Sequence, residues 1–110
     1  MSDLTQESCQ VCRTDSPRVG EDEMRALLEQ LPDWYVEVRE GIPQLERRFQ
    51  FPDFLQALTF THRVGELAQA QDHHPRLITE WGSVVVTWWT HKIKGLHRND
   101  FVMAAKTDRL

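Results

Sequence analysis

The spacing of apolar residues changes repeatedly along this 110-residue chain, and this change is the strongest constraint on its fold. Between residues 52 and 71 apolar side chains recur at helical spacing, which predicts a long helix with one buried face. On both sides of that segment apolar and polar residues alternate, as they do in half-buried strands. Further stretches with helical spacing precede the first strands and follow the last. Helices and strands in this order predict an antiparallel sheet covered by helices.

The pattern also sets the expected limits of each element. The expected helices lie at 21–31, at 52–71 and from about residue 100, and the expected strands lie at 34–38, 45–51, 76–80 and 83–90. Pro32 ends the first helix, because proline has no amide hydrogen to continue it. Gly82 suits a tight turn between the last two strands. The expected fold class is α+β, helix-strand-strand-helix-strand-strand-helix, with a four-stranded antiparallel sheet and three helices on one face.

Two places within these elements carry more specific expectations. Gly65 lies within the apolar arc of the long helix, where glycine costs about 1 kcal/mol of helix stability relative to alanine. We therefore expect another backbone to approach it closely. Trp88 and Trp89 are neighbours on a strand, so their side chains point to opposite faces of the sheet. One of the two rings is expected either to be partly exposed or to form a subunit interface or pocket wall.

Composition limits the classes of partner. A chain of this length forms one domain, and its 13 Lys and Arg against 17 Asp and Glu give a net charge of −4. No basic segment is dense enough for a phosphate-binding surface, so nucleic acid is not an expected direct partner. No apolar run approaches the roughly 20 residues of a membrane span, and residues 1–7 do not resemble a secretory signal. The expected location is the cytoplasm, with no membrane association.

Residues 1–20 lack apolar periodicity, so they are expected to form a mobile N-terminal arm ahead of a domain at 21–110. The two cysteines of the chain, Cys9 and Cys12, lie in this arm with the spacing of half a zinc ribbon. Either two chains together complete a four-ligand metal site, or the pair are thiols on the arm without a metal. No metal site is expected in the domain itself.

Three of the five histidines occupy positions suited to a common site. His73 and His74 follow the long helix, and the proline after them favours an extended backbone on which adjacent side chains diverge. Antiparallel pairing of the last two strands would bring His74 close to His91. Imidazoles titrate near neutral pH, so this cluster favours general acid and base catalysis without a cofactor. Structural hydrogen bonds and a three-histidine zinc site are the alternatives, while His62 and His97 are expected to be solvated.

These residues also resemble a known family. The segments Asp72-His73-His74-Pro75, Trp81, Thr90-His91, Gly95-Leu96 and Asp100 are similar to those of pterin-4a-carbinolamine dehydratase, which recycles the pterin of aromatic amino-acid hydroxylases. The resemblance covers residues 21–107, and residues 79–101 look most like the bacterial form associated with phenylalanine hydroxylase. It implies dehydration of a 4a-hydroxytetrahydropterin to the quinonoid dihydropterin, with no cofactor. It also implies homodimers or homotetramers and a link to the phenylalanine hydroxylase system.

The resemblance further implies the roles of individual residues. The catalytic residues would be His73, His74 and His91. The pterin pocket would be lined by these histidines together with Asp72, Trp89, Thr90, Lys92 and Gln69. Gln69 departs from the family, which usually has an acid at this position; an amide can hydrogen-bond a pterin but supplies no charge, so reduced activity is expected. An alternative function is a non-catalytic dimerisation cofactor or regulatory module, similar to a transcriptional coactivator, that acts through protein contacts.

Overall fold

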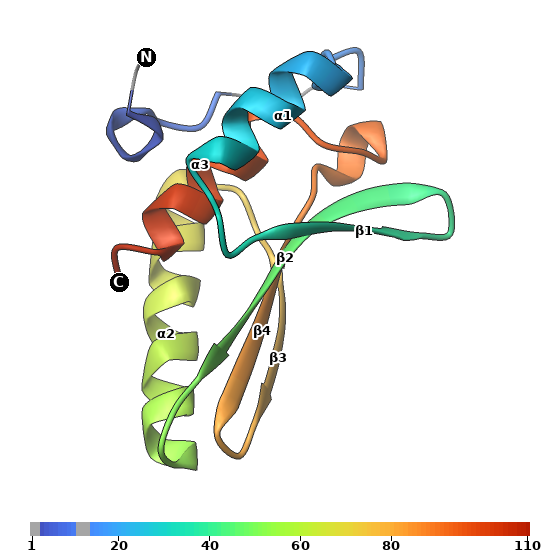
Figure 1. The fold of residues 1–110 in the computed structure, drawn as a ribbon. Helices are drawn as coiled ribbons and strands as arrows, with labels where there is room; N and C mark the ends of the chain where they lie inside the picture. The colour runs from blue at the N-terminus through green and yellow to red at the C-terminus, as the bar shows by residue number, and fades with distance from the viewer. Residues whose placement is uncertain (1–2, 11–13) are drawn as a thin grey trace.

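The helices and strands of the chain follow the predicted order (Figure 1). The structure is a computed structural model, and it describes residues 3–10 and 14–110. Its helices are α1 (Glu21–Glu29), α2 (Phe54–Gln71) and α3 (Arg98–Thr107), with the short 3-10 helices η1 (Leu4–Gln6) and η2 (His91–Ile93). Its strands are β1 (Tyr35–Arg39), β2 (Ile42–Gln50), β3 (Arg76–Glu80) and β4 (Ser83–Trp88). The predicted α+β class is confirmed.

The strands form one antiparallel sheet in the order β1-β2-β4-β3. Pairing of Leu45 with Trp88 and of Phe49 with Val84 aligns apolar residues across the centre of this sheet. Helices α2 and α3 pack against the strands, whereas the turn between β1 and β2 extends away from them (Figure 1). The core consists mainly of Leu45, Val84, Val86 and Trp88 from the sheet, Ala57, Val64 and Ala68 from α2, and Phe101, Met103 and Ala104 from α3.

The ends of α2 and α3 place the segments that form the site. Asp72 closes α2 in a left-handed conformation with φ of 52°, which turns the chain away from the helix axis just before His73. Helix α3 begins with a capping box. In it, Nδ1 of His97 accepts the Asn99 amide at 3.0 Å, and the Asp100 carboxylate accepts the His97 amide at 2.9 Å.

The structure corrects three expectations. Gly65 is exposed, and a Cβ added to it would meet no described atom within 4 Å, so the predicted close backbone approach is wrong. The last strand ends at Trp88 rather than at residue 90, because Thr90 pairs instead with Gly95 across a short loop. His97 is buried rather than solvated, since its ring caps α3. The other boundaries differ from the expected ones by at most three residues.

The two neighbouring tryptophans have different environments. Trp88 is fully buried in the core, and Trp89 is half-buried with its ring stacked on His91. Trp89 is therefore the partly exposed ring of the pair, and it lies next to His91. His62 is exposed beside Glu66, as predicted for a solvated histidine.

The described part of the N-terminal arm lies against α3. Leu4 is fully buried in the core, and Arg98 of α3 donates two hydrogen bonds to the Glu7 carboxylate at 2.8 and 2.7 Å. The sequence pattern did not indicate these contacts, because Leu4 has polar neighbours on both sides. Mobility of residues 1–20 stays a prediction, and Cys12 lies outside the described residues. Within the described ranges, none of the helices has the length and apolar character needed to cross a membrane.

Candidate functional site

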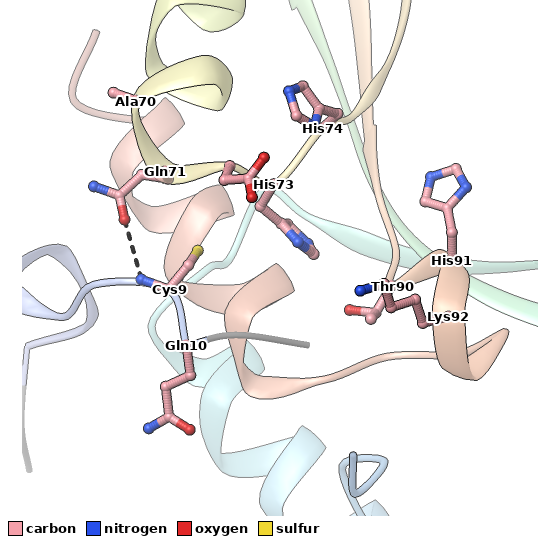
Figure 2. Close-up of a pocket in the computed structure, with 10 residues that line it drawn as sticks. Cys9, Gln10, Ala70, Gln71, His73, His74, Thr90, His91 and Lys92 are labelled. Carbon is pink, nitrogen blue, oxygen red and sulfur yellow. Dashed lines mark hydrogen bonds between the residues drawn. The ribbon is translucent and has the colours of Figure 1, made fainter. Parts of the chain in front are cut away.

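A pocket of about 710 Å³ lies where the end of α2, the chain around η2 and the N-terminal arm meet. Its volume falls within the range of roughly 300–1,000 Å³ that is typical of small-molecule sites. It is lined by Cys9, Gln10, Ala70, Gln71, Asp72, His73, His74, Thr90, His91 and Lys92. Figure 2 shows His73 between Cys9 on one side and His91 on the other. The three histidines thus reach one pocket from two segments of the chain.

The backbone after α2 gives the two adjacent histidines different environments. The His73 amide donates to the Ala68 carbonyl at 3.1 Å, and the chain then leaves the helix towards Pro75 and β3. The His73 side chain is buried, whereas His74 is exposed. The predicted divergence of the two side chains is confirmed.

His73 belongs to a buried hydrogen-bonded network. Its Nε2 lies 2.6 Å from Oδ1 of Asp100, a residue that is 0% exposed. The other carboxylate oxygen of Asp100 accepts the Thr90 hydroxyl at 2.8 Å and the His97 amide at 2.9 Å. The His73 ring is also stacked on Trp88, with centroids 5.8 Å apart and planes inclined by 10°. These contacts hold the ring in one orientation and leave Nδ1 as the ring nitrogen that can exchange a proton with a ligand.

His74 and His91 have contacts nearer the surface. Nε2 of His74 lies 3.0 Å from Oε1 of Gln69, and because an amide oxygen only accepts, Nε2 carries the hydrogen in this contact. The His91 ring is stacked on Trp89 with centroids 4.4 Å apart and planes inclined by 25°. Both histidines therefore keep a defined position while remaining open to solvent or a ligand.

Most of the predicted site residues come together. Asp72, Thr90 and Lys92 line the pocket with the three histidines. Gln69 and Trp89 are not among the pocket-lining residues, and they contact His74 and His91 instead. The expected proximity of the start of β3 to the end of β4 accounts for this grouping.

Sequence reasoning gave Asp100 and Gln10 no place in the pocket, and it considered Cys9 only as a metal ligand or a thiol of the arm. An acid in the first turn of a helix ordinarily reads as a capping residue, so the position of Asp100 does not reveal its contact with His73. Cys9 and Gln10 were placed in an arm outside the domain. The positions of Asp100, Cys9 and Gln10 at the site depend on contacts between distant segments, for which a single sequence carries no signal.

The described ranges, 3–10 and 14–110, contain no group of three or more His, Cys, Asp or Glu side chains that could hold a metal ion. Nε2 of His73 is bonded to Asp100.

Known proteins of similar sequence identify the family. The family model described as pterin 4 alpha carbinolamine dehydratase matches residues 17–110. The chain belongs to the pterin-4a-carbinolamine dehydratase family. A protein of Saccharophagus degradans named "Putative pterin-4-alpha-carbinolamine dehydratase" is 58% identical over 110 residues, which are 100% of this chain and 97% of that protein. Among solved structures, the "transcriptional coactivator/pterin dehydratase" of Brucella melitensis has a TM-score of 0.75 and is 32% identical, over 84% of this chain and 97% of that one.

As a member of the pterin-4a-carbinolamine dehydratase family, the chain is a hydro-lyase. The segment that the family model matches contains every described pocket residue except Cys9 and Gln10. The histidines and the buried carboxylate of Asp100 therefore lie within the part of the chain that defines the family.

Proposed function

We propose that the pocket removes water from a 4a-hydroxytetrahydropterin and releases the quinonoid dihydropterin, with His73 and His91 transferring protons and His74 holding the ring. One observation carries this proposal. A fully buried carboxylate fixes His73 at a wall of the pocket that His91 reaches from another segment. Paired imidazoles in a pocket of this size suit proton transfer at neutral pH.

The reaction needs one proton donor and one proton acceptor. The bond between C4a and the hydroxyl oxygen breaks, and a general acid protonates that oxygen so that it leaves as water. The electron pair of the neighbouring nitrogen forms the new carbon-nitrogen double bond, and a base takes the proton of that nitrogen. One proton enters and one leaves, so two imidazoles in opposite protonation states are sufficient.

The contacts of the three histidines support different roles. The Asp100 carboxylate engages Nε2 of His73, which leaves Nδ1 as the nitrogen for proton transfer to or from the pterin. His91 is exposed, so it can exchange protons with water between turnovers. His74 is oriented by Gln69 through the nitrogen that carries its hydrogen, which suits a hydrogen-bonding role toward the pterin.

The neighbouring polar residues supply recognition. Asp72 and Lys92 are exposed on opposite pocket segments and offer an acceptor and a donor to the pterin ring. The Thr90 hydroxyl is donated to Asp100, so Thr90 contributes by fixing that carboxylate. Gln69 and Trp89 contribute through His74 and His91.

The cellular setting belongs to the same proposal. The product would return to the pterin cycle of phenylalanine hydroxylase in the cytoplasm, as the resemblance implies. The enzyme would act as a homodimer or homotetramer. Large apolar side chains exposed on α2, among them Phe54, Leu55 and Leu58, support self-association.

The direct test follows the decay of enzymatically generated 4a-hydroxytetrahydropterin by ultraviolet absorbance at neutral pH, with and without the protein. Wild type should accelerate the decay, and His73→Ala and His91→Ala should remove most of the acceleration. His62→Ala is the matched control, because His62 lies exposed on α2 outside the pocket. Absence of acceleration by folded wild-type protein would reject the proposed dehydration.

A partner-binding module is the second candidate function. It is favoured by the exposed apolar side chains of α2 and by the coactivator description of the Brucella melitensis relative. The two functions separate in the triple variant His73→Ala, His74→Ala, His91→Ala. A module would retain self-association and partner binding in this variant, whereas dehydration would be lost.

A further inference from the structure

The N-terminal arm forms one wall of the active-site pocket. Cys9 and Gln10 line the pocket together with the three histidines. Figure 2 shows the Cys9 sulfur pointing into the space between Gln71 and His73, while the Gln10 side chain points away from the histidines. Cys9 is therefore the arm residue whose side chain is placed to meet a ligand.

Side chains of two helices fix the arm backbone at this place. Gln71, the last residue of α2, accepts the Cys9 amide through its Oε1 at 3.0 Å (Figure 2). Asn99, in the first turn of α3, accepts the Gln10 amide at 2.9 Å and donates to the Gln10 carbonyl at 2.8 Å. The arm thus joins the two helices that carry the catalytic network.

Contacts farther along the arm hold it against α3. Leu4 is 0% exposed, Lys106 donates to the Thr5 carbonyl at 3.0 Å, and Arg98 binds the Glu7 carboxylate through two nitrogens. Ordering a backbone residue costs roughly 1–2 kcal/mol, so an arm needs several such contacts to remain in place. This series of contacts extends from Leu4 to the pocket.

The arm and the catalytic histidine share one support. Asn99 binds the arm backbone, and the next residue, Asp100, binds His73 and Thr90. The first turn of α3 therefore sets the position of Cys9 relative to His73. A wall that is fixed relative to a reacting group can select among ligands by size.

We propose that Cys9 is a specificity-determining residue of the pterin site, which limits the size of the substituent carried by the pterin ring. This inference rests on the proposed dehydration of a pterin. A flat bicyclic ring held by His73 and His91 leaves the remainder of the 710 Å³ pocket to its substituent, and Cys9 lies across from His91 (Figure 2). Cys9 also lies outside residues 17–110, which the family model matches, so the arm sets the substituent preference separately from the catalytic residues.

The test compares two substrates that differ only in the substituent at C6, the 6-methyl and the 6-dihydroxypropyl 4a-hydroxytetrahydropterins. Cys9→Trp fills the space, and we expect it to raise KM for the dihydroxypropyl compound by about 10-fold or more. KM for the methyl compound should change far less. Cys9→Ala widens the space and should shift the ratio of kcat/KM in favour of the larger substrate. Gln6→Trp is the matched control, because Gln6 is exposed on the same arm away from the pocket.

The outcomes distinguish this inference from the proposed function. Equal effects of Cys9→Trp on both substrates, or no effect on either, in protein with the wild-type melting temperature would overturn the role of Cys9. If Cys9→Trp does not fold, the ratio measured for Cys9→Ala decides, and an unchanged ratio rejects the inference. If wild type does not accelerate dehydration, the proposed function fails. In that case, the role of Cys9 is tested by measuring binding of the 6-methyl and 6-dihydroxypropyl 7,8-dihydropterins by fluorescence quenching. Equal affinities in wild type and Cys9→Trp would reject the proposal that Cys9 limits the size of the substituent.

Discussion

At His73, Nε2 faces a carboxylate that solvent does not reach, and that carboxylate also accepts hydrogen bonds from Thr90 and His97. A buried charge is costly unless hydrogen bonds compensate for it. Asp100 receives these bonds from Thr90, which follows β4, and from His97, the N-cap of α3. The free-energy cost of burying the carboxylate is therefore offset within the folded domain. Asp100 is therefore a positioning residue that acts through His73.

The first prediction concerns the proton-transfer residues. His73→Ala and His91→Ala should each lower kcat by about 10²–10⁴, because each removes a proposed general acid or base. His74→Ala should mainly raise KM, since His74 is proposed to hold the ring. Steady-state dehydration kinetics check these values. If His74→Ala alone abolishes turnover while the other two variants keep the full rate, the assignment of roles is wrong.

Gln69 gives a second prediction at the scale of one residue. Its Oε1 lies 3.0 Å from Nε2 of His74, and a carboxylate in that place would favour the protonated imidazole. Gln69→Glu should therefore raise the dehydration rate at neutral pH. Gln56→Glu adds the same charge at an exposed position elsewhere on α2 and serves as the control. An unchanged or lower rate in Gln69→Glu contradicts the prediction.

The third prediction concerns the cap at the start of α3 and the pH dependence of stability. Burial lowers the pKa of His97 below its ordinary value of 6.5, and nearby His73 acts in the same direction, whereas Asp100 and Glu23 act in the opposite one. Neutral His97 accepts the Asn99 amide through Nδ1, and protonation at Nδ1 would break this cap. The unfolded chain thus binds a proton more readily than the folded one.

The linkage between this pKa and stability fixes the direction of the effect. The stabilisation is fully present above the unfolded value of about 6.5 and is lost as pH falls from there through the lower folded value. His97→Asn, which caps a helix without titrating, should flatten the decline in melting temperature between about pH 8 and pH 5. Thermal unfolding of the two proteins across this range checks the prediction. Parallel curves would show that His97 is not the titrating group.

The elements were predictable where the pattern is local. The period of apolar residues located the three α-helices and the four strands. Gly82, whose φ is 79°, indicated the turn between β3 and β4. The expectation for Gly65 was wrong because the predicted apolar face of the helix was too wide. The buried face of α2 consists of Ala57, Phe60, Val64 and Ala68 and does not include Gly65. His97 was misjudged because capping depends on where a helix begins, which pattern locates only within a few residues.

The site was predictable only in part for a related reason. His73, His74 and His91 follow from strand pairing, which fixes which segments meet at an edge of the sheet. The contact of His73 with Asp100 joins residues 27 positions apart, and that of Gln10 with Asn99 joins residues 89 positions apart. Spacing along the sequence cannot specify such contacts, because they depend on how α2, α3 and the arm pack together.

For the molecule as a whole, the single chain leaves a substantial apolar surface uncovered. On α2, Phe54 is 44% exposed, Leu55 71% and Leu58 47%. These positions lie within about one turn of the helix, so they form one contiguous apolar surface. The strands β1 and β3 are also edges of the sheet, whose backbone groups are open to pairing. Both features favour association with a second copy of the chain.

The fourth prediction follows from this surface. Wild-type protein at micromolar concentration should sediment at a multiple of the 12.9 kDa chain mass, because burying large apolar side chains contributes about 25 cal/mol for each Å² removed from water. The double variant Leu55→Glu, Leu58→Glu should shift the mass toward a single chain, since burying unpaired carboxylates at an interface is unfavourable. Leu110→Glu changes an exposed leucine at the C-terminus and should leave the mass unchanged. Sedimentation equilibrium measures all three proteins, and a wild-type mass of one chain would contradict association through α2. Because the pocket is lined by the end of α2, the residues that follow it, the chain around η2 and the arm of one chain, the monomeric variant should retain part of its dehydration activity.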